Sequence, residues 1–306
     1  MAEAVEDFLR SADIAQAGSD DVRFTYSRPE QRLAQRILIR AIELLTGQPR
    51  LERTYRDWAR NPPPGETIFA AAIRLLEIGI DVDEAAMARV PRKGPLLIVA
   101  NHPFGVLDGL VLGHLATRMR PDTRIMTHSL LCQPPEVRDF LLPVDFGGTP
   151  QALATTLETR RRALAWLAGG HSLAIFPGGS VSTSQHPWHG PAIDPPWHPF
   201  AAKLARQPGV TILPVYFHGQ NSRLFQLASH VNYALRIALL FRESSRRMGA
   251  GIKVSIGEPF SSEGLAALGG RAAVLRELRR RTYGLAGPAG PDPDMEFHWP
   301  AHINWD

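Results

Sequence analysis

Short apolar runs that end in turn residues alternate with longer helical stretches from residue 91 onward, and this alternation limits the chain to few folds. The runs are Leu96–Ala100, Arg124–Thr127, Leu142–Asp145, Leu173–Phe176, Thr211–Phe217 and Lys253–Ile256. Helices are expected at Leu110–Arg118, Gln151–Ala168, Pro199–Arg206, Ala234–Arg247 and 271–283. The pattern predicts an α/β fold with a largely parallel central sheet flanked by helices. In such sheets, functional residues gather beyond the carboxyl ends of the strands.

The composition agrees with a globular enzyme-sized domain. Of 306 residues, 44% are hydrophobic and 21% are charged, which excludes a disordered chain, a collagen-like repeat and a disulfide scaffold. Cys132 is the single cysteine, so no internal disulfide can form and a reducing compartment is expected. No apolar run is long enough to span a membrane, and the first residues are acidic where a signal peptide is basic. We therefore expect a cytoplasmic protein.

The charge is small overall but unevenly distributed. A formal net charge of +4 does not demand a nucleic-acid partner, and none is expected. Residues 1–22 are acidic, whereas residues 23–60 are rich in arginine, which is typical of a surface for anionic lipid head groups or phosphates. The alternative is a general preference for arginine, because the only lysines are Lys93, Lys203 and Lys253.

An amphipathic helix is predicted inside the basic segment. Its apolar stripe consists of Leu33, Ile37, Ala41, Leu44 and Leu45. Beside that stripe lie the predicted membrane-binding residues Arg32, Arg36 and Arg40. A basic amphipathic helix can lie in the interface of a membrane, so we expect a membrane surface with anionic lipids as a partner. The alternative is a surface helix that packs its apolar stripe against the core.

The sequence divides into four predicted parts. An acidic arm covers residues 1–22, and a basic two-helix region for membrane association covers residues 23–90, with its second helix at Glu66–Ile78. The α/β domain covers residues 91–283. A tail rich in proline and glycine covers residues 284–306, from which Phe297, Trp299 and Trp305 are expected to dock on the body.

The first candidate catalytic feature follows the run that ends at Ala100. Asn101 and His102 come directly after it, and a turn leads to Asp108 and a new helix. A histidine there would face the crevice, and a carboxylate returning to its ring would fix the tautomer and stabilise the imidazolium. The pair would act as a general base with its orienting group. In the alternative reading, Asn101 and Asp108 only cap backbone groups of a turn.

The second feature follows Phe176, where Gly178 and Gly179 precede Ser180 and Ser182. Adjacent glycines let a substrate approach the backbone, and free N–H groups there could hold an anion or an oxyanion. The alternative is a plain turn at a strand end. A serine nucleophile is disfavoured, because residues 178–182 lack the Gly-x-Ser-x-Gly pattern.

Together these motifs resemble those of the glycerolipid acyltransferase superfamily, which includes the 1-acylglycerol-3-phosphate acyltransferases. The hallmarks of that family are Asn-His-x4-Asp, then Phe-Pro-Glu-Gly-Thr-Arg-Ser, then a strand that reads roughly Val-Pro-Val. The matching residues here, in the same order, are Asn101-His102 with Asp108, Phe176-Pro177-x-Gly179-Ser180-x-Ser182, and Ile212-Leu213-Pro214-Val215. Leu142–Asp145 falls where the family has a further block, and the resemblance covers about residues 91–260.

The chain departs from the family pattern at several positions. Five residues, not four, separate His102 from Asp108, and Gly105 could absorb the extra one. Gly178 and Val181 stand where the family has Glu and Arg. Phe146 stands where the second block has Arg. Those charged residues are associated in the family with the glycerol phosphate of the acceptor. Their absence favours another lyso-lipid, for example a lyso-ornithine aminolipid, with Arg223 as a candidate anion ligand.

The resemblance implies an O-acyltransferase of lipid biosynthesis and phospholipid metabolism. His102 would take the proton of the hydroxyl of a lyso-lipid acceptor, Asp108 would orient the imidazole, and the acyl donor would be acyl-CoA or acyl carrier protein. Candidate substrate-binding residues are Asn101, Gly178, Gly179, Ser180, Ser182, Pro214 and Arg223. The family uses no metal or other cofactor, and the enzyme would sit peripherally on the inner face of the membrane. Alternatives are a catalytically weak lipid-binding protein of the same fold and a thioester hydrolase.

A segment rich in histidine and proline follows the glycine turn. His186, His189, His198 and Asp194 could in principle ligate zinc. No spacing among them is diagnostic, so we favour an irregular loop that covers the substrate, and no metal site is predicted.

Overall fold

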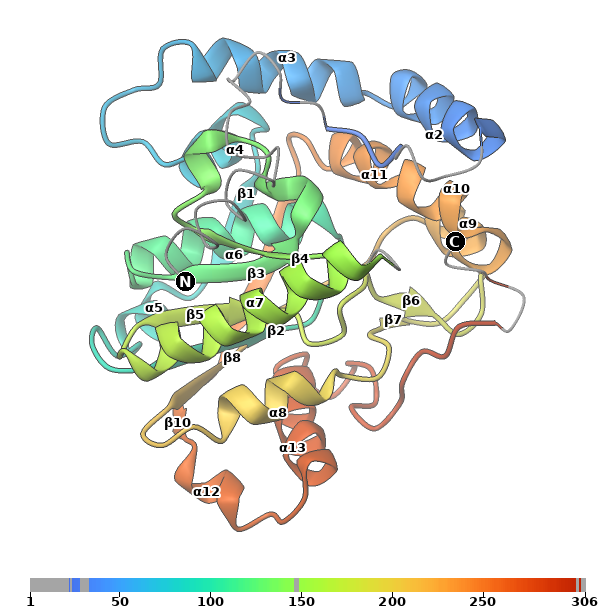
Figure 1. The fold of residues 1–306 in the computed structure, drawn as a ribbon. Helices are drawn as coiled ribbons and strands as arrows, with labels where there is room; N and C mark the ends of the chain where they lie inside the picture. Colours follow the sequence, from blue (N-terminus) through green and yellow to red (C-terminus); the bar gives the residue numbers. More distant parts are fainter. Residues whose placement is uncertain (1–21, 23, 28–32, 146–148, 301–302, 304–306) are drawn as a thin grey trace.

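The computed structural model describes residues 22, 24–27, 33–145, 149–300 and 303 (Figure 1). Within these residues the centre of the fold is an eight-stranded sheet in the order β1-β9-β8-β2-β5-β3-β4, with β10 paired beside β8. The strands are β1 (Gly79–Val82), β2 (Leu96–Ala100), β3 (Arg124–His128), β4 (Leu141–Val144), β5 (Ser172–Ile175), β8 (Thr211–Phe217), β9 (Gly251–Ile256) and β10 (Phe260–Ser261). A small second sheet pairs β6 (Thr183–Ser184) with β7 (Ala192–Ile193).

The sheet is largely parallel. β4, β3, β5, β2 and β8 run in one direction, whereas β9 runs antiparallel to β8 and pairs in parallel with β1. Every residue of the central strand β2 is buried, as expected of a strand covered on both faces. Leu96, Ile98 and Ala100 join one hydrophobic core, and Leu97 and Val99 join the other. The predicted fold class is confirmed.

Helices cover both faces of the sheet. α4 (Ile68–Leu75) and α6 (Val106–Met119) pack with the first core, and α7 (Pro150–Ala168), α8 (Pro199–Ala205) and α13 (Arg271–Gly284) pack with the second. Figure 1 shows α8 and α13 together on one side of the sheet. Shorter elements are α5 (Glu84–Ala88), α12 (Glu263–Ala266) and the 3₁₀ turns η3 (Ser129–Cys132) and η4 (Pro135–Val137).

The N-terminal region differs from the predicted pair of helices. It contains α2 (Leu33–Leu45), α3 (Gln48–Ala59) and α4, with Gly47 at φ 100° between the first two. β1 then pairs with β9, so the sheet begins within residues 23–90 rather than after them. Sequence reasoning missed α3 because its residues are largely polar, and missed β1 because that strand is short and partly exposed.

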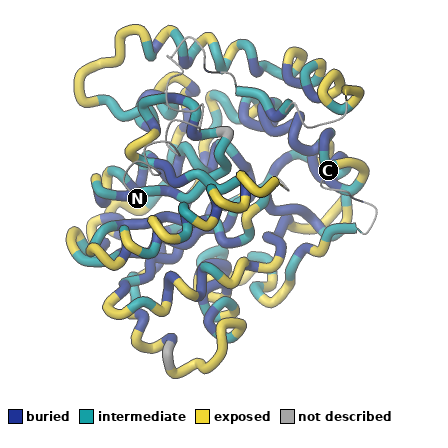
Figure 2. The backbone as a smooth tube through the Cα atoms, viewed as in Figure 1, coloured by how far each residue is buried: buried dark blue, intermediate teal, exposed yellow. Residues whose placement is uncertain are grey.

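The apolar stripe of α2 faces away from the protein (Figure 2). Its exposed fractions are 69% for Leu33, 61% for Ile37, 58% for Leu44 and 86% for Leu45. The buried residues of the helix are Ile39 and Glu43, on the opposite side. The alternative in which the stripe packs on the core is therefore wrong. Arg36 is exposed and Arg40 half-buried, whereas Arg32 lies outside the described residues.

A third core joins α2 to the C-terminal half of the chain. It contains Ile39 together with residues of α9 (Arg223–Val231), α10 (Tyr233–Ala238) and α11 (Leu240–Arg246). The stretch Ala234–Arg247 is thus two helices, divided at Leu239, rather than one. Beyond α13, Phe297 is fully buried against Trp299, as predicted for the tail, and Trp305 lies outside the described residues. Within the described part of the chain, no helix is both long and apolar enough to cross a bilayer.

Candidate active site

The candidate site lies where β2, β5 and β8 end. The three strands are neighbours and parallel, so their carboxyl ends meet at one edge of the sheet. The chain leaves β2 into the turn of His102 and leaves β5 into the glycine turn at Gly178. The parallel topology therefore brings the two predicted motifs together, as expected for functional loops of such sheets.

His102 and Asp108 form a close pair. Nδ1 of His102 lies 3.0 Å from Oδ2 of Asp108, and the exposed fraction is 18% for the His102 side chain and 0% for Asp108. The same carboxylate oxygen accepts the main-chain N–H groups of Phe104 at 2.7 Å and Gly105 at 2.9 Å. Asp108 thus caps the main-chain N–H groups of the turn and also faces the His102 ring. Both interpretations of Asp108 from the sequence, as a cap and as the orienting group of the base, therefore apply. Nε2 is left for the crevice.

Gly105 accommodates the extra residue of the motif. It adopts φ 82° and ψ −121°, a conformation that residues with a side chain rarely take. A Cβ atom at Gly105 would also come within 3.0 Å of the Leu240 side chain and 3.1 Å of the Val181 side chain. Five intervening residues therefore still bring Asp108 back to His102.

The electrostatics of the pair follow from burial. Desolvation raises the pKa of the Asp108 carboxyl, and the His102 ring and the two amide donors oppose that rise. Arg247, half-buried after α11, stacks its guanidinium 4.2 Å from the ring centre of Phe104 and donates to the carbonyl of Gln220. Burial lowers the pKa of Arg247, and the carboxylates of Glu243 and Asp108 oppose this. Arg247 is therefore a cation beside the pair that sequence reasoning missed.

Phe176 supports the imidazole from β5. Its ring stacks on that of His102, with centroids 4.2 Å apart and planes 29° from parallel. The stacking and the Asp108 contact together fix the ring in two directions. Sequence reasoning treated Phe176 only as part of a motif, and its place directly after the neighbouring parallel strand was the signal that could have identified the contact.

Asn101 connects two strand ends. Its side-chain amide donates to the carbonyl of Phe217 at 3.0 Å and accepts the N–H of Phe217 at 2.7 Å. It is buried, and both ends of its amide are used within the protein. A direct contact of Asn101 with substrate, as predicted, would have to displace these bonds.

The glycine turn presents backbone and one hydroxyl. Gly179 has φ 66° and donates its N–H to the carbonyl of Phe176 at 3.0 Å. Ser180 is half-buried, and its Oγ has no hydrogen-bond partner among the described residues. A polar atom left unpaired in this way is available to a ligand. Gly178 lies against Asp194, whose carboxylate accepts the N–H of His102, so the start of the glycine turn is near the His102 turn. Contact of Gly178, Gly179 and Ser180 with a substrate stays a prediction.

The side chains of the remaining candidates, Ser182, Pro214 and Arg223, contact other parts of the protein, although the main-chain N–H of Ser182 donates to the carbonyl of His102. Ser182 is buried, and its hydroxyl donates to Asp194. Pro214 is buried within β8. Its ring packs against Gly257 so closely that a Cβ atom added to Gly257 would lie only 2.7 Å from it. Arg223 starts α9 and donates to the carbonyl of Gly190 at 3.0 Å.

The histidine-rich segment forms no ligand cluster. The rings of His186 and His189 lie 4.6 Å apart, whereas His198 contacts Arg160 and caps α8. Asp194 is fully buried and faces Ser182 instead. In the described part of the chain, no three His, Cys, Asp or Glu side chains converge as metal ligands would.

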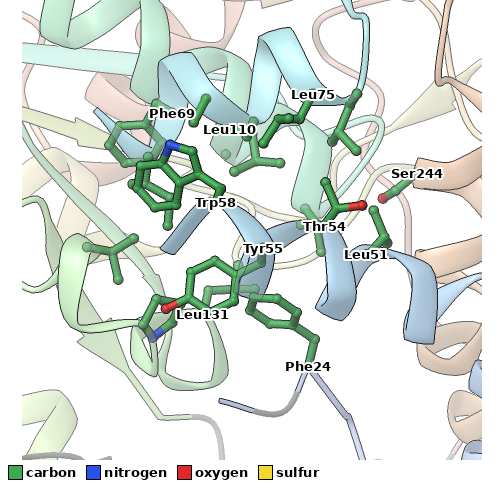
Figure 3. Close-up of a pocket in the computed structure, with 18 of the residues that line it drawn as sticks. Phe24, Leu51, Thr54, Tyr55, Trp58, Phe69, Leu75, Leu110, Leu131 and Ser244 are labelled. Carbon is green, nitrogen blue, oxygen red and sulfur yellow. The ribbon is translucent and has the colours of Figure 1, made fainter. Parts of the chain in front are cut away.

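An apolar cavity lies under the N-terminal helices (Figure 3). It holds about 1050 Å³ of space free of atoms, part of it open to solvent. α3 and α4 line it with Trp58, Phe69 and Leu75 among others, and α6 lines it with Val106 and Gly109. One of these lining residues, Gly109, directly follows Asp108 of the His102–Asp108 pair in the sequence.

The chain is similar to known proteins over much of its sequence. Residues 31–289 match the family described as Acyltransferase. A lyso-glycine lipid O-acyltransferase from Phocaeicola vulgatus is 22% identical over 174 residues, which are 56% of this chain and 59% of that protein, so the chain spans little more than half of this curated relative. The solved 1-acyl-sn-glycerophosphate acyltransferase from Thermotoga maritima is 14% identical, with a TM-score of 0.47, and the match covers 82% of this chain and 86% of that one. The family match spans most of the sequence, and the chain belongs to the acyltransferase family.

Proposed function

We propose that the chain is an O-acyltransferase that moves a fatty acyl group from a thioester donor to the hydroxyl of a lyso-lipid. The observation that carries the proposal is the His102–Asp108 contact of 3.0 Å at the carboxyl end of β2, in a chain of the acyltransferase family. Acyl-CoA and acyl carrier protein are the candidate donors, since both present the acyl group as a thioester.

The proposed reaction needs one general base. Nε2 of His102 takes the proton of the acceptor hydroxyl while Asp108 stabilises the imidazolium. The acceptor oxygen attacks the thioester carbonyl carbon, and the C–S bond breaks as the ester C–O bond forms. The thiolate leaves with the proton held by His102, so the enzyme returns to its first state. Main-chain N–H groups of Gly178 and Ser180 are the candidate donors for the oxyanion, since the N–H of Gly179 is already bonded to the carbonyl of Phe176.

The acceptor that the chain fits best is an aminolipid or another lyso-lipid rather than a phosphate monoester. Val181, which stands where the family has Arg, is buried against Gly105 and brings no charge. A phosphate dianion in a cleft without a bidentate arginine is left with unpaired charge. The relative named for a lyso-glycine lipid supports an aminolipid. We therefore propose a lyso-aminolipid, with lysophosphatidic acid a poor substrate.

The apolar cavity is the candidate site for an acyl chain. Its lining is almost wholly hydrocarbon, from residues such as Trp58, Phe69 and Leu110 (Figure 3). Its lining includes Val106 and Gly109 on the first turns of α6, the helix that also carries Asp108, and on this basis an acyl chain in the cavity is proposed to direct its thioester or ester toward His102. Burial of each methylene favours binding by about 0.8 kcal/mol.

A membrane with anionic lipids is the proposed partner of α2. Leu33, Ile37 and Leu44 form an exposed stripe, and Arg36 and Arg40 lie along one side of it. Such a helix can bury its apolar side at the head-group boundary while arginine reaches lipid phosphates. The proposed location is peripheral, on the inner face of the membrane, where the acyl donors are available.

The test is an assay of the pure protein with labelled acyl-CoA or acyl carrier protein and a panel of lyso-lipids. The panel includes lyso-glycine lipid, lyso-ornithine lipid, lysophosphatidylcholine and lysophosphatidic acid. Labelled diacyl product is expected, with the aminolipids preferred. Free fatty acid without diacyl product would identify a thioester hydrolase, and binding without turnover would identify a lipid-binding protein. Efficient, selective use of lysophosphatidic acid would contradict the acceptor proposal and point to another cation, such as Arg247 or Arg223.

A further inference from the structure

Asp194 is a buried carboxylate for which the proposed reaction has no use. It follows β7, has an exposed fraction of 0%, and pairs with no lysine or arginine side chain among the described residues. Oδ1 accepts the main-chain N–H of His102 at 3.2 Å and the hydroxyl of Ser182. Oδ2 accepts the indole N–H of Trp197 at 3.0 Å. A carboxylate buried in this way is costly unless it is hydrogen-bonded, and here the bonds that satisfy it connect it to His102, Ser182 and Trp197.

A set of hydrogen bonds that includes Asp194 holds both main-chain groups of His102, the proposed base. The N–H of His102 is held by the carboxylate, and its carbonyl accepts the N–H of Ser182 at 2.8 Å. Because the hydroxyl of Ser182 returns to the same carboxylate, three residues form a closed set of hydrogen bonds. The set joins the turn after β2 to the loop that follows the glycine turn.

Gly178 leaves the space that Asp194 fills. A Cβ atom at Gly178 would lie 3.1 Å from the Cβ of Asp194 and 3.4 Å from its Cγ. Gly178 stands where the motif that this turn resembles has Glu. The glycine turn therefore has no carboxylate at position 178. The carboxylate of Asp194, from farther along the chain, lies against this position.

We propose that Asp194 is a positioning residue of the acyl-transfer site, which fixes the backbone of His102 and replaces the acidic side chain missing at Gly178. The proposal rests on the proposed function for the role of His102. Asp194 acts through His102 and Ser182 and does not touch the reacting atoms. Its own backbone is held by the Tyr283 hydroxyl, by Arg279 and by the N–H of Phe297.

The charge of Asp194 gives the proposal a readout beyond stability. Its field already acts on Tyr216, whose pKa is raised to about 12 by burial and then by Asp194. A negative charge near an imidazole favours the protonated ring. The other charged or titratable groups around this site are Asp108 on α6, Arg247 after α11, and Tyr283 and Arg279 on α13. A substitution at Asp194 leaves all of these residues in place, although burial and then the charge of Asp194 raise the pKa of Tyr283.

The variant is Asp194→Asn, which keeps the shape and removes the charge. The pKa of His102, followed by NMR in histidine-labelled protein and assigned with His102→Ala, is expected to fall by at least about half a unit. This measurement needs no turnover, so it is independent of the proposed function. In the acyl-transfer assay, kcat is expected to fall about 10- to 100-fold with KM little changed, and the acid limb of the pH profile is expected to move to lower pH.

Two further variants separate positioning from folding. Asp122→Asn changes a carboxylate before β3, at the opposite edge of the sheet, and is expected to leave the His102 pKa and kcat unchanged. Ser182→Ala removes one bond of the set and is expected to give a smaller loss that is not additive with Asp194→Asn. A folded Asp194→Asn protein with the wild-type His102 pKa would overturn the proposal. So would a loss of activity that only follows the folded fraction.

Discussion

The turn after β2 and the outer face of α2 are built in opposite ways. At the turn, the side chains are enclosed by the protein: Asp108 is fully buried, and His102 contacts Asp108 and stacks on Phe176. On α2, Leu33 and Leu45 lie in solvent without a partner. The contrast indicates that the proposed chemistry is fixed by the fold alone, whereas access to a membrane-borne substrate depends on something outside the chain. Variants in the two regions should therefore fail in different ways.

The largest effect is expected at the turn. His102→Ala removes the proposed base and should lower kcat by about 10²–10⁴-fold on both vesicle-borne and detergent-dispersed acceptor. Steady-state rates on the two substrate forms measure it. His171→Ala is the matched control, because His171 precedes β5 at the far edge of the sheet and stacks on Trp166. A His102→Ala protein with a near wild-type rate would remove the basis of the mechanism.

Asp108→Asn should act in the same way but less strongly. The amide cannot stabilise the imidazolium, and it brings two donors toward the N–H groups of Phe104 and Gly105 or toward the ring. We expect kcat to fall by on the order of 10²-fold on either substrate form, with some loss of thermal stability. Circular dichroism on the same samples separates the two effects. Loss confined to vesicle-borne substrate would contradict the contrast between the regions.

Changes on α2 should spare the chemistry. Arg36→Gln with Arg40→Gln removes two charges, each worth about 1 kcal/mol near an anionic surface, so vesicle binding should weaken about 30-fold at low salt. The rate on detergent-dispersed acceptor should not change. Co-sedimentation with anionic vesicles at low and high salt measures binding. The matched control is Arg271→Gln with Arg276→Gln, two exposed arginines of α13.

The apolar stripe offers a second comparison on the same helix. Leu33→Ser with Ile37→Ser should weaken binding to vesicles at every salt concentration. Leu153→Ser with Leu157→Ser is the control, because these leucines of α7 are also more than half exposed. Equal effects of both pairs would show that α2 has no special role.

A change in the cavity should alter selectivity rather than rate or binding to vesicles. Gly109 lines the cavity, and no atom lies within 4 Å of the position of a Cβ there. Gly109→Leu should therefore fold normally and fill part of the cavity, so that kcat/KM for long acyl chains falls about 10-fold relative to short ones. Gly109→Ala should give a smaller shift in the same direction. Unchanged chain-length selectivity in both variants would show that the acyl chain does not bind in the cavity.

The smallest effect is expected at the buried side of α2. Burial raises the pKa of Glu43, and its bonds from Tyr26 and Thr25 oppose the rise. A raised pKa means that the stability contributed by Glu43 is complete in acid, below its ordinary value of 4.5, and is lost as pH rises through the folded-state value. Glu43→Gln should flatten this pH dependence and change unfolding free energy near neutral pH by about 1 kcal/mol or less. Urea unfolding across pH tests it.

Much of the fold could be predicted because buried parallel strands leave a clear pattern. β2 and β8 lie where the apolar runs predicted them, since both are covered on two faces. The His102–Asp108 pair was also predictable, because its residues are neighbours in sequence. Asp194 was not, because it reaches His102 across 92 residues and only the packed fold brings them together. The same distance explains why its sequence context was read as a possible zinc loop.

The hydrogen bonds from Arg279 and Phe297 to Asp194 have a consequence for biosynthesis. Arg279 and the N–H of Phe297 both bind the carbonyl of Asp194, and Arg279 also binds the carbonyl of Pro293. His102 and Asp108 are translated well before residues 279–297, which anchor Asp194. A nascent chain would thus carry the His102–Asp108 pair without its support. Turnover would begin only once residue 297 has left the ribosome and folded back.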